Sequence, residues 1–88
     1  MKADRNKVLW RCRRGIRELD SILMPFAENC YDELSALDKA RLQTLLGYQD
    51  TQLLEWILGR TMPNEEELHG LINSIILYSN EARRTESI

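Results

Sequence analysis

Apolar residues recur along this chain at intervals of three and four positions, and this spacing limits the fold more than any other feature of the sequence. Such intervals place side chains on one face of an α-helix, whereas a half-buried strand needs strict alternation of apolar and polar residues. No segment of the chain alternates in that way. The 88 residues suffice for one domain with a modest core. The sequence therefore predicts an all-α fold, a small single-domain bundle of about five short helices.

The first two predicted helices are separated by Gly15. The first covers about residues 4–13 and the second about residues 16–30. Pro25 lies inside the second helix, where it cannot donate a hydrogen bond to the carbonyl of Ser21, so we expect a kink or an end there. The apolar positions predicted for the core in this part of the chain are Val8, Cys12, Ile16, Leu19, Leu23, Phe26, Ala27 and Cys30.

The third and fourth predicted helices are short, and each ends at a glycine. The third begins with Ser35 as its N-cap and leaves Gly47 at the position that follows its end. The fourth covers about residues 50–58, with Asp50 as its cap and Gly59 at its end. This fourth helix is apolar nearly all round, so we expect other elements to cover it on most sides.

The fifth predicted helix begins near Asn64, a good capping residue. Three glutamates at positions 65–67 then fill its first turn, where the helix dipole favours negative charge. Its apolar stripe ends at Tyr78, and no periodicity is left after about Asn80. We therefore expect a single helical domain over residues 1–80 and a flexible C-terminal tail over residues 81–88.

The composition is that of an ordinary soluble globular protein, with 43% hydrophobic and 30% charged residues. No apolar run approaches the ~20 residues that a membrane-spanning helix needs. The N-terminal residues are not followed by the apolar stretch of a secretory signal. We therefore expect a cytoplasmic bacterial protein with no membrane insertion.

Residue types that carry chemistry are sparse in this sequence. His69 is the only histidine, and nothing near it in sequence would orient it as a catalytic base. Cys12 and Cys30 form no CxxC pair, and a zinc site needs about four ligands, so we expect buried, reduced thiols and no metal. The chain has no GxGxxG or P-loop sequence to hold a dinucleotide or a phosphate. We expect no catalytic residue, no cofactor of its own and no enzymatic activity.

Basic residues are concentrated at the N-terminal end. Residues 1–17 hold seven of the 12 basic residues and one of the 14 acidic residues, although the whole chain has a net charge of −2. Trp10 lies among them and could stack on a nucleic-acid base while the cations bind phosphates. However, the acidic remainder of the chain would repel a polyanion, and arginine and tryptophan also dominate protein interfaces. The pattern favours a protein-docking surface over a solvated face or a nucleic-acid site, and it leaves open whether Trp10 points inward or outward.

Residues 14–20 join the first two predicted helices and carry the most information. Gly15 allows a sharp turn, and Arg14 carries a rigid five-donor fork that suits a carboxylate on a partner. Glu18 falls in the first turn of the second helix, where the dipole stabilises its charge. Alternatively, Arg14 and Glu18 form an exposed ion pair with each other, although Gly15 would interrupt the helix between them. The residues alone leave both interpretations open.

Residues 13–20 resemble the RGxxE signature of the SdhE, or flavinator, family, whose mitochondrial relatives are succinate dehydrogenase assembly factors. The resemblance continues at residues 24–26 and 31–35, in the Leu45-Leu46 pair before Asp50, and at residues 55–59, and it covers about residues 5–78. The RGxxE signature alone is short. Followed by Trp-x-x-Gly at this spacing, in a chain of this length, it is much more specific.

This resemblance implies a five-helix fold and a specific function. The protein would be an FAD assembly factor that binds the flavoprotein subunit of succinate dehydrogenase and promotes covalent attachment of FAD to a histidine of that subunit. The flavoprotein subunit of fumarate reductase is a second implied client, and in both cases the partner carries the FAD. The residues that carry over as partner-binding are Arg14, Gly15 and Glu18, with Arg17 and Asp20 as weaker candidates.

Two other hypotheses remain open at this point. The first is an antitoxin-like regulatory protein that binds a toxin or a cytoskeletal partner. The second is a nucleic-acid-binding protein that uses the basic N-terminal segment, which steeply salt-dependent binding to an oligonucleotide would reveal.

Overall fold

The computed structural model describes residues 2–86 and the side chains of residues 5–81. Residues 2–86 form five α-helices and two short 3-10 helices, with no strand among them, so the predicted all-α class is confirmed. In chain order these elements are α1 (Lys2–Cys12), α2 (Arg17–Cys30), η1 (Tyr31–Glu33), α3 (Ala36–Leu45), α4 (Asp50–Ile57), η2 (Glu66–Leu68) and α5 (His69–Glu86).

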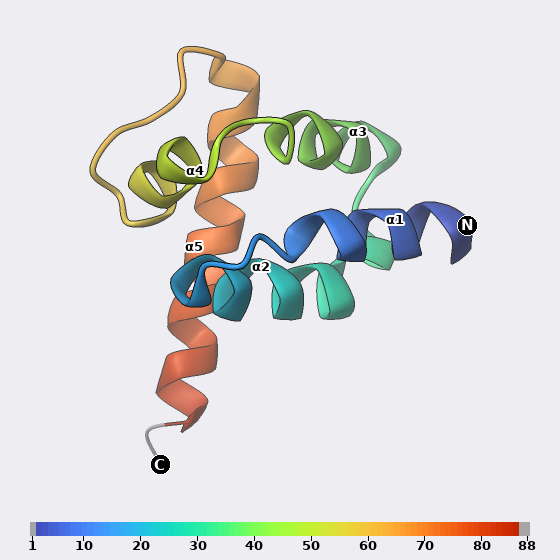
Figure 1. Ribbon diagram of the computed structural model, residues 1–88, viewed down its shortest axis with the longest axis horizontal. Helices are drawn as coiled ribbons and strands as arrows, with labels where there is room; N and C mark the ends of the chain where they lie inside the picture. Colours follow the sequence, from blue (N-terminus) through green and yellow to red (C-terminus); the bar gives the residue numbers. More distant parts are fainter. Residues whose placement is uncertain (1, 87–88) are drawn as a thin grey trace.

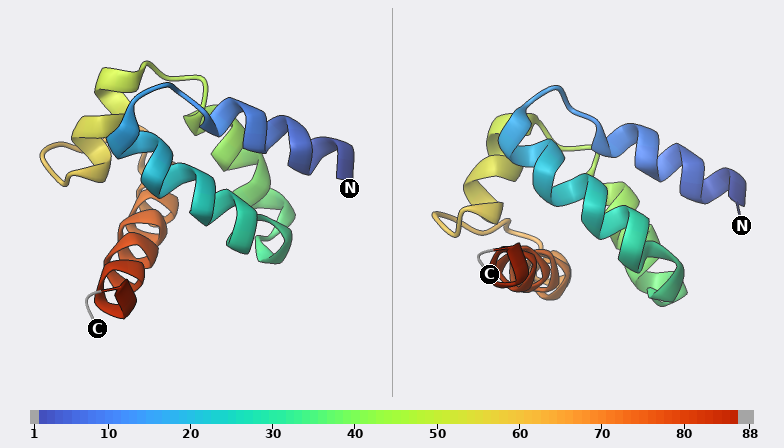
Figure 2. Two further views of the ribbon diagram at one scale, coloured as in Figure 1. Left: turned by 60° about the horizontal axis from the view of Figure 1, so that its bottom comes forward. Right: turned by 90° about the horizontal axis from the view of Figure 1, so that it is seen from below.

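Helices α1 and α2 form an antiparallel hairpin, which Figures 1 and 2 show from three sides. Helix α5 crosses this hairpin steeply and passes close to α2 and α4 (Figure 1). Helix α3 lies on the other side of the hairpin from the C-terminal end of α5. The turn between α1 and α2 lies near the connection between α3 and α4, because Arg14 in this turn donates to carbonyl oxygens of Leu46 and Tyr48.

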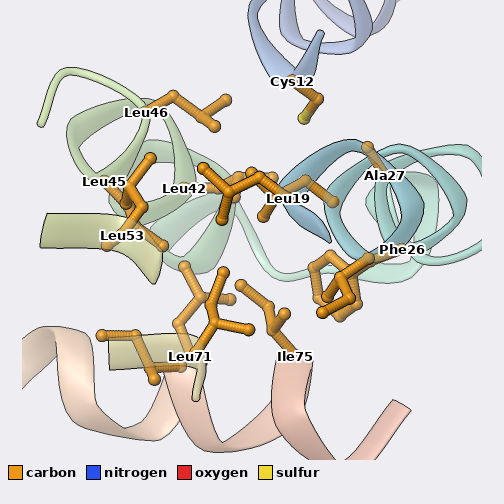
Figure 3. Packing of buried hydrophobic residues seen from close by; sticks show 14 of the residues in the cluster. Cys12, Leu19, Phe26, Ala27, Leu42, Leu45, Leu46, Leu53, Leu71 and Ile75 are labelled. Carbon is orange, nitrogen blue, oxygen red and sulfur yellow. The ribbon is translucent and has the colours of Figure 1, made fainter. Parts of the chain in front are cut away.

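The core lies where α2, α3, α4 and α5 converge (Figure 3). Every buried side chain of its cluster is apolar, which is the usual outcome when burial of apolar surface drives folding. Most of the apolar positions that the helical spacing predicted are buried, including Val8 and Cys12 on α1. The buried members are Val8, Cys12, Leu19, Ile22, Leu23, Phe26, Ala27, Tyr31, Leu42, Leu45, Leu46, Leu53, Trp56, Ile57, Leu68, Leu71, Ile72 and Ile75.

Helix α4 is covered on most sides, as expected, because Leu53, Trp56 and Ile57 are buried and Leu54 is half-buried. Leu58, the last residue of the predicted fourth helix, is the C-cap of α4 and is exposed. Leu37, an apolar residue near the start of α3, is also exposed, at 58%.

Helix α2 continues through Pro25 to Cys30, so the expected end at this proline is absent. Pro25 is half-buried and Ser21 is exposed. The carbonyl of Ser21 that loses its helical donor therefore lies on the outer side of α2, where water can reach it. Packing of the four apolar side chains that follow Ser21 on the inner face holds the helix together across this site.

The helix caps follow the sequence only in part. Ser35 caps α3 as predicted, because its Oγ accepts a hydrogen bond of 3.1 Å from the backbone N–H of Asp38. Gly59 ends α4 with a φ of +77°, also as predicted. The N-cap of α4 is Gln49 rather than Asp50, and Gln52 Oε1 accepts from the Gln49 N–H at 3.2 Å. Asp50 is thereby left free for another partner.

The last helix differs most from its prediction. Asn64 does not cap it, because residues 66–68 first form η2 with Glu65 as N-cap, and α5 begins only at His69. Helix α5 then extends to Glu86, beyond the last periodic apolar residue, because good helix formers such as glutamate, alanine and arginine follow Asn80. The flexibility expected for residues 81–88 stays a prediction, and residues 87–88 lie outside the described range.

Candidate partner-binding site

The turn between α1 and α2 is held by one carboxylate. Asp20 accepts hydrogen bonds from the backbone N–H of Arg14 at 2.7 Å and from that of Gly15 at 3.2 Å. Gly15 has a φ of +86°, in the left-handed region where a side chain would be strained. A Cβ built at Gly15 would meet no other atom within 4 Å, so this residue faces open space. Backbone conformation, and not crowding, requires glycine here.

The side chain of Arg14 ties this turn to the connection between α3 and α4. Its Nε donates to Oδ1 of Asp50 at 2.6 Å. Its Nη1 donates to the carbonyl oxygens of Leu46 at 2.8 Å and Arg11 at 3.1 Å, and its Nη2 donates to the carbonyl oxygen of Tyr48 at 2.7 Å. The side chain is only 16% exposed. Arg14 therefore clamps three stretches of the chain together.

This arrangement corrects the expected use of the Arg14 fork. The fork was expected to meet a carboxylate on a partner, but four of its hydrogen bonds go to oxygen atoms of its own chain. The alternative ion pair with Glu18 does not form among the described side chains either. Sequence reasoning had assigned Asp50 to a helix cap, and it missed the ion pair because the two residues are 36 positions apart. Asp20 likewise holds the turn instead of pointing to solvent.

Three residues of the segment lie on the outer side of the turn. Gly15, Arg17 and Glu18 are all exposed, and we call them the motif face. Among the side chains that the structure describes, those of Arg17 and Glu18 have no hydrogen-bond or ion-pair partner. Glu18 lies in the first turn of α2, as predicted, so the helix dipole favours its negative charge. The segment thus divides into an inner clamp and an outer face that can receive a partner.

Trp10 extends this outer surface along α1. Its side chain is 74% exposed, which answers the question that the sequence left open. Lys7 and Arg13 are also exposed, and within the described part of the chain their side chains form no ion pair. Arg5 differs, because it lies 3.4 Å from the carboxylate of Asp32. Most of the N-terminal positive charge is therefore uncompensated by the protein itself.

The two thiols and the histidine are buried to different degrees. Cys12 is fully buried, and this burial raises the pKa of its thiol to about 11. Cys30 is only half-buried, so the prediction of buried thiols holds fully for one of the two free cysteines. His69 is half-buried, and its Nε2 donates to the carbonyl oxygen of Pro63 at 2.6 Å. Within the part of the chain that is described, no three side chains of the kinds that bind metals converge.

Tyr48 forms a second link in the α3–α4 connection. Its hydroxyl donates to the carboxylate of Glu65, and its ring packs edge-on against Trp56 with 4.9 Å between the ring centroids. The hydrogen bond raises the pKa of Tyr48 and lowers the pKa of Glu65. Because the Tyr48 carbonyl also accepts from Arg14, this residue connects the clamp to the loop before η2.

The Tyr48–Glu65 link predicts a specific pH dependence of stability. The pKa of Glu65 in the folded protein lies below its ordinary value of 4.5, so the ionised carboxylate stabilises the fold above pH 4.5. That stabilisation disappears as the pH falls through the lower, folded-state pKa. We expect Tyr48→Phe to have a lower Tm than the unchanged protein at pH 7, and we expect the gap to shrink as the pH falls below 4.5. Thermal unfolding followed by circular dichroism across this range measures the gap, and a gap independent of pH contradicts the assignment.

No helix within residues 2–86 is both long and apolar enough to cross a membrane.

The fold and the site are those of a small all-α protein that presents a locked turn, a free carboxylate and unpaired cations on one surface. A family model described as "Flavinator of succinate dehydrogenase" matches residues 6–78, and the chain belongs to this family. The resemblance found in the sequence is thereby confirmed.

Curated relatives of this family cover most of the chain. The chain is 36% identical over 76 residues to the FAD assembly factor SdhE of Colwellia psychrerythraea, and these residues make up 86% of this chain and 84% of the relative. It is 42% identical over 69 residues to the SdhE of Photorhabdus laumondii, over 78% of both chains. It is 39% identical over 77 residues to the SdhE of Yersinia pestis, over 88% of this chain and 86% of the relative.

Proposed function

We propose that this chain is an FAD assembly factor that binds the flavoprotein subunit of succinate dehydrogenase and promotes covalent attachment of its FAD. Membership of the flavinator family and the name shared by its relatives support this function. The structural observation that carries it is the motif face, where Gly15, Arg17 and Glu18 stand exposed on a turn fixed from behind by Arg14 and Asp20. The flavoprotein subunit of fumarate reductase is a second client of the same kind.

The proposal divides the work between the two proteins. The client holds the FAD and supplies the histidine, and the bond forms between them. This chain is not an enzyme and has no FAD of its own. It acts in the cytoplasm and binds the client in the conformation in which histidine and flavin meet. A binding protein favours one conformation of its partner only when it binds that conformation more tightly than the partner's other conformations.

The locked turn lowers the free-energy cost of binding at the motif face. The hydrogen bonds from Asp20 and Arg14 fix the backbone of the motif before the client arrives. Ordering a loop on binding costs free energy, and a preorganised loop avoids that cost. The carboxylate of Glu18 is free to accept a hydrogen bond or a cation from the client, and Gly15 lets the client backbone approach closely.

Covalent flavin on the client tests the proposal. The client subunit is expressed with this chain, without it, with Glu18→Ala and with Glu66→Ala, and denatured samples are read for flavin fluorescence on a gel. Glu66 is the matched control, because it is an exposed glutamate in the first turn of another helical element. We expect a strong band with the unchanged chain and with Glu66→Ala, and at least about a tenfold weaker band with Glu18→Ala, since losing a charge-assisted contact costs at least one factor of ten.

Equal bands in every lane, with a folded client and FAD supplied, would show that the chain does not promote flavinylation. A strong band with Glu18→Ala, but none without the chain, would keep the function and move the contact away from Glu18.

A further inference from the structure

Side chains of α1 and α2 line an open groove on the hairpin, about 290 Å³ in volume. Two half-buried apolar residues, Leu9 and Met24, line it and pack against the core. Trp10 stands beside them, far more exposed than a side chain of its size usually is. The complete lining is Asn6, Leu9, Trp10, Arg13, Met24 and Glu28. This hollow has an apolar floor and a mixed, charged rim, like a pocket that receives a side chain of a partner.

Trp10 has no role inside the fold that would explain its position. Among the described residues it takes part in no ring–ring contact and in no cation–π contact. Asn6 and Arg13 lie four positions before it and three after it, so all three share one face of α1. Tryptophan and arginine are the residue types that most often contribute the largest part of a binding energy.

The groove is continuous with the motif face. Arg17 lies seven positions before Met24, and Glu28 lies four after it, so these three residues form one stripe along α2. The groove therefore leads from Glu28 toward the turn, and it reaches the motif face at Arg13 and Arg17. The cationic groups at this end have no ion-pair partner within the described residues. The opposite end carries Glu28, whose backbone carbonyl accepts from Arg5.

The motif face alone is too small to hold a partner. It consists of three exposed residues, whereas a stable protein interface takes about 20–30 residues from each side. The neighbouring surface must therefore contribute to any complex. The groove adjoins it directly, has an exposed aromatic residue and bears uncompensated positive charge.

We propose that this groove is a second part of the client-binding surface and takes an acidic segment of the same flavoprotein subunit. The segment places an apolar side chain over Leu9 and Met24, against the ring of Trp10, and a carboxylate near Arg13 and Arg17. This inference rests on the proposed function, because it takes the client bound at the motif face as the occupant. Charge and continuity select this occupant: the cations match an acidic segment, and a chain bound at Glu18 runs directly into the groove.

Affinity for the client tests the groove separately from the motif. The full-length chain and its Trp10→Ala, Arg13→Glu and Leu37→Ala variants are titrated into the FAD-loaded flavoprotein subunit by calorimetry. Leu37 is the matched control, since it is an exposed apolar residue on α3 that does not line the groove. We expect Trp10→Ala to weaken binding about 30-fold, as for the loss of an interface anchor, and Leu37→Ala to change it less than about twofold.

Arg13→Glu tests the charge of the expected segment. We expect this variant to bind the client about tenfold or more weakly than the unchanged chain at about 50 mM salt. The difference in affinity should become smaller at about 500 mM salt, because salt screens exposed charges. All three variants should keep the melting temperature of the unchanged chain, since the replaced side chains are exposed.

The outcomes separate the groove from the proposed function. The groove proposal is wrong, and the proposed function stands, if the Trp10→Ala and Arg13→Glu variants bind the client as tightly as the unchanged chain does. If the unchanged chain neither binds the client nor raises its covalent flavin, the proposed function itself fails. Tighter, Trp10-dependent binding to a single-stranded oligonucleotide would overturn the proposal in favour of nucleic acid. Self-association that Trp10→Ala abolishes would overturn it in favour of a second copy of this chain.

Discussion

Replacing Arg14 with alanine is expected to lower the melting temperature by more than about 10 °C. The substitution removes an ion pair to Asp50 and three hydrogen bonds to backbone carbonyls, and it leaves four acceptors without their donor. A hydrogen bond to a charged group contributes about 1.5 kcal/mol or more, so the loss of all four costs about 3 kcal/mol or more. In a domain of this size, 1 kcal/mol corresponds to about 4–8 °C in Tm.

Arg13→Ala is the natural control, because Arg13 is the neighbouring arginine and is exposed. We expect its Tm to stay within about 2 °C of the unchanged protein, as for most exposed substitutions. The Tm of Arg14→Lys should lie between those of Arg14→Ala and Arg13→Ala. Lysine keeps the charge opposite Asp50 but lacks the planar fork that reaches three carbonyls at once. Thermal unfolding by circular dichroism gives all three values. Equal melting temperatures for Arg13→Ala and Arg14→Ala would show that the clamp contributes no stability.

The helices of this fold are largely predictable because their signals are local. The spacing of apolar residues depends on the helix repeat alone, and it placed all five helices and most of the core. Ser35 and Gly59 acted as predicted because a cap bonds to a residue within one turn. The predicted start of the last helix is wrong, because Asn64 and the glutamates after it have the residue types of a helix N-terminus. In the structure, these residues instead form a loop and a 3-10 turn before α5.

The clamp could not be predicted, because it is made by contacts between distant parts of the chain. Arg14 meets Leu46, Tyr48 and Asp50 across more than 30 positions. The positive φ of Gly15 also interrupts the helical repeat, so spacing cannot tell which way the residue before it points. A motif read as one row of partner-binding residues therefore proved to have an inner and an outer half. Of the motif residues, Gly15, Arg17 and Glu18 are exposed, and their binding to a partner stays a prediction.

Leu19→Ala is the second substitution with a large expected effect, and it acts on the residue next to Glu18. Leu19 is fully buried and points into the centre of the core, close to Leu42 in Figure 3. Truncating a buried leucine to alanine costs about 3–5 kcal/mol, because it removes apolar contacts and leaves a cavity. We expect a drop in Tm of at least about 12 °C, measured by thermal unfolding. Leu19→Met, which nearly conserves the volume, should cost less than about 1.5 kcal/mol.

The two neighbours should behave in opposite ways. Glu18→Ala removes an exposed side chain, so it should leave Tm nearly unchanged while covalent flavin on the client falls at least about tenfold. Leu19→Ala should lower Tm while leaving flavinylation intact at about 10 °C, provided that the helical signal of the variant is complete at that temperature. If Leu19→Ala abolished flavinylation at a temperature where its helical signal is complete, display of the motif would depend on the core and not only on the clamp. Comparison of Glu18→Ala with Leu19→Ala therefore distinguishes the side chain expected to contact the client from the side chain that stabilises the fold around the motif.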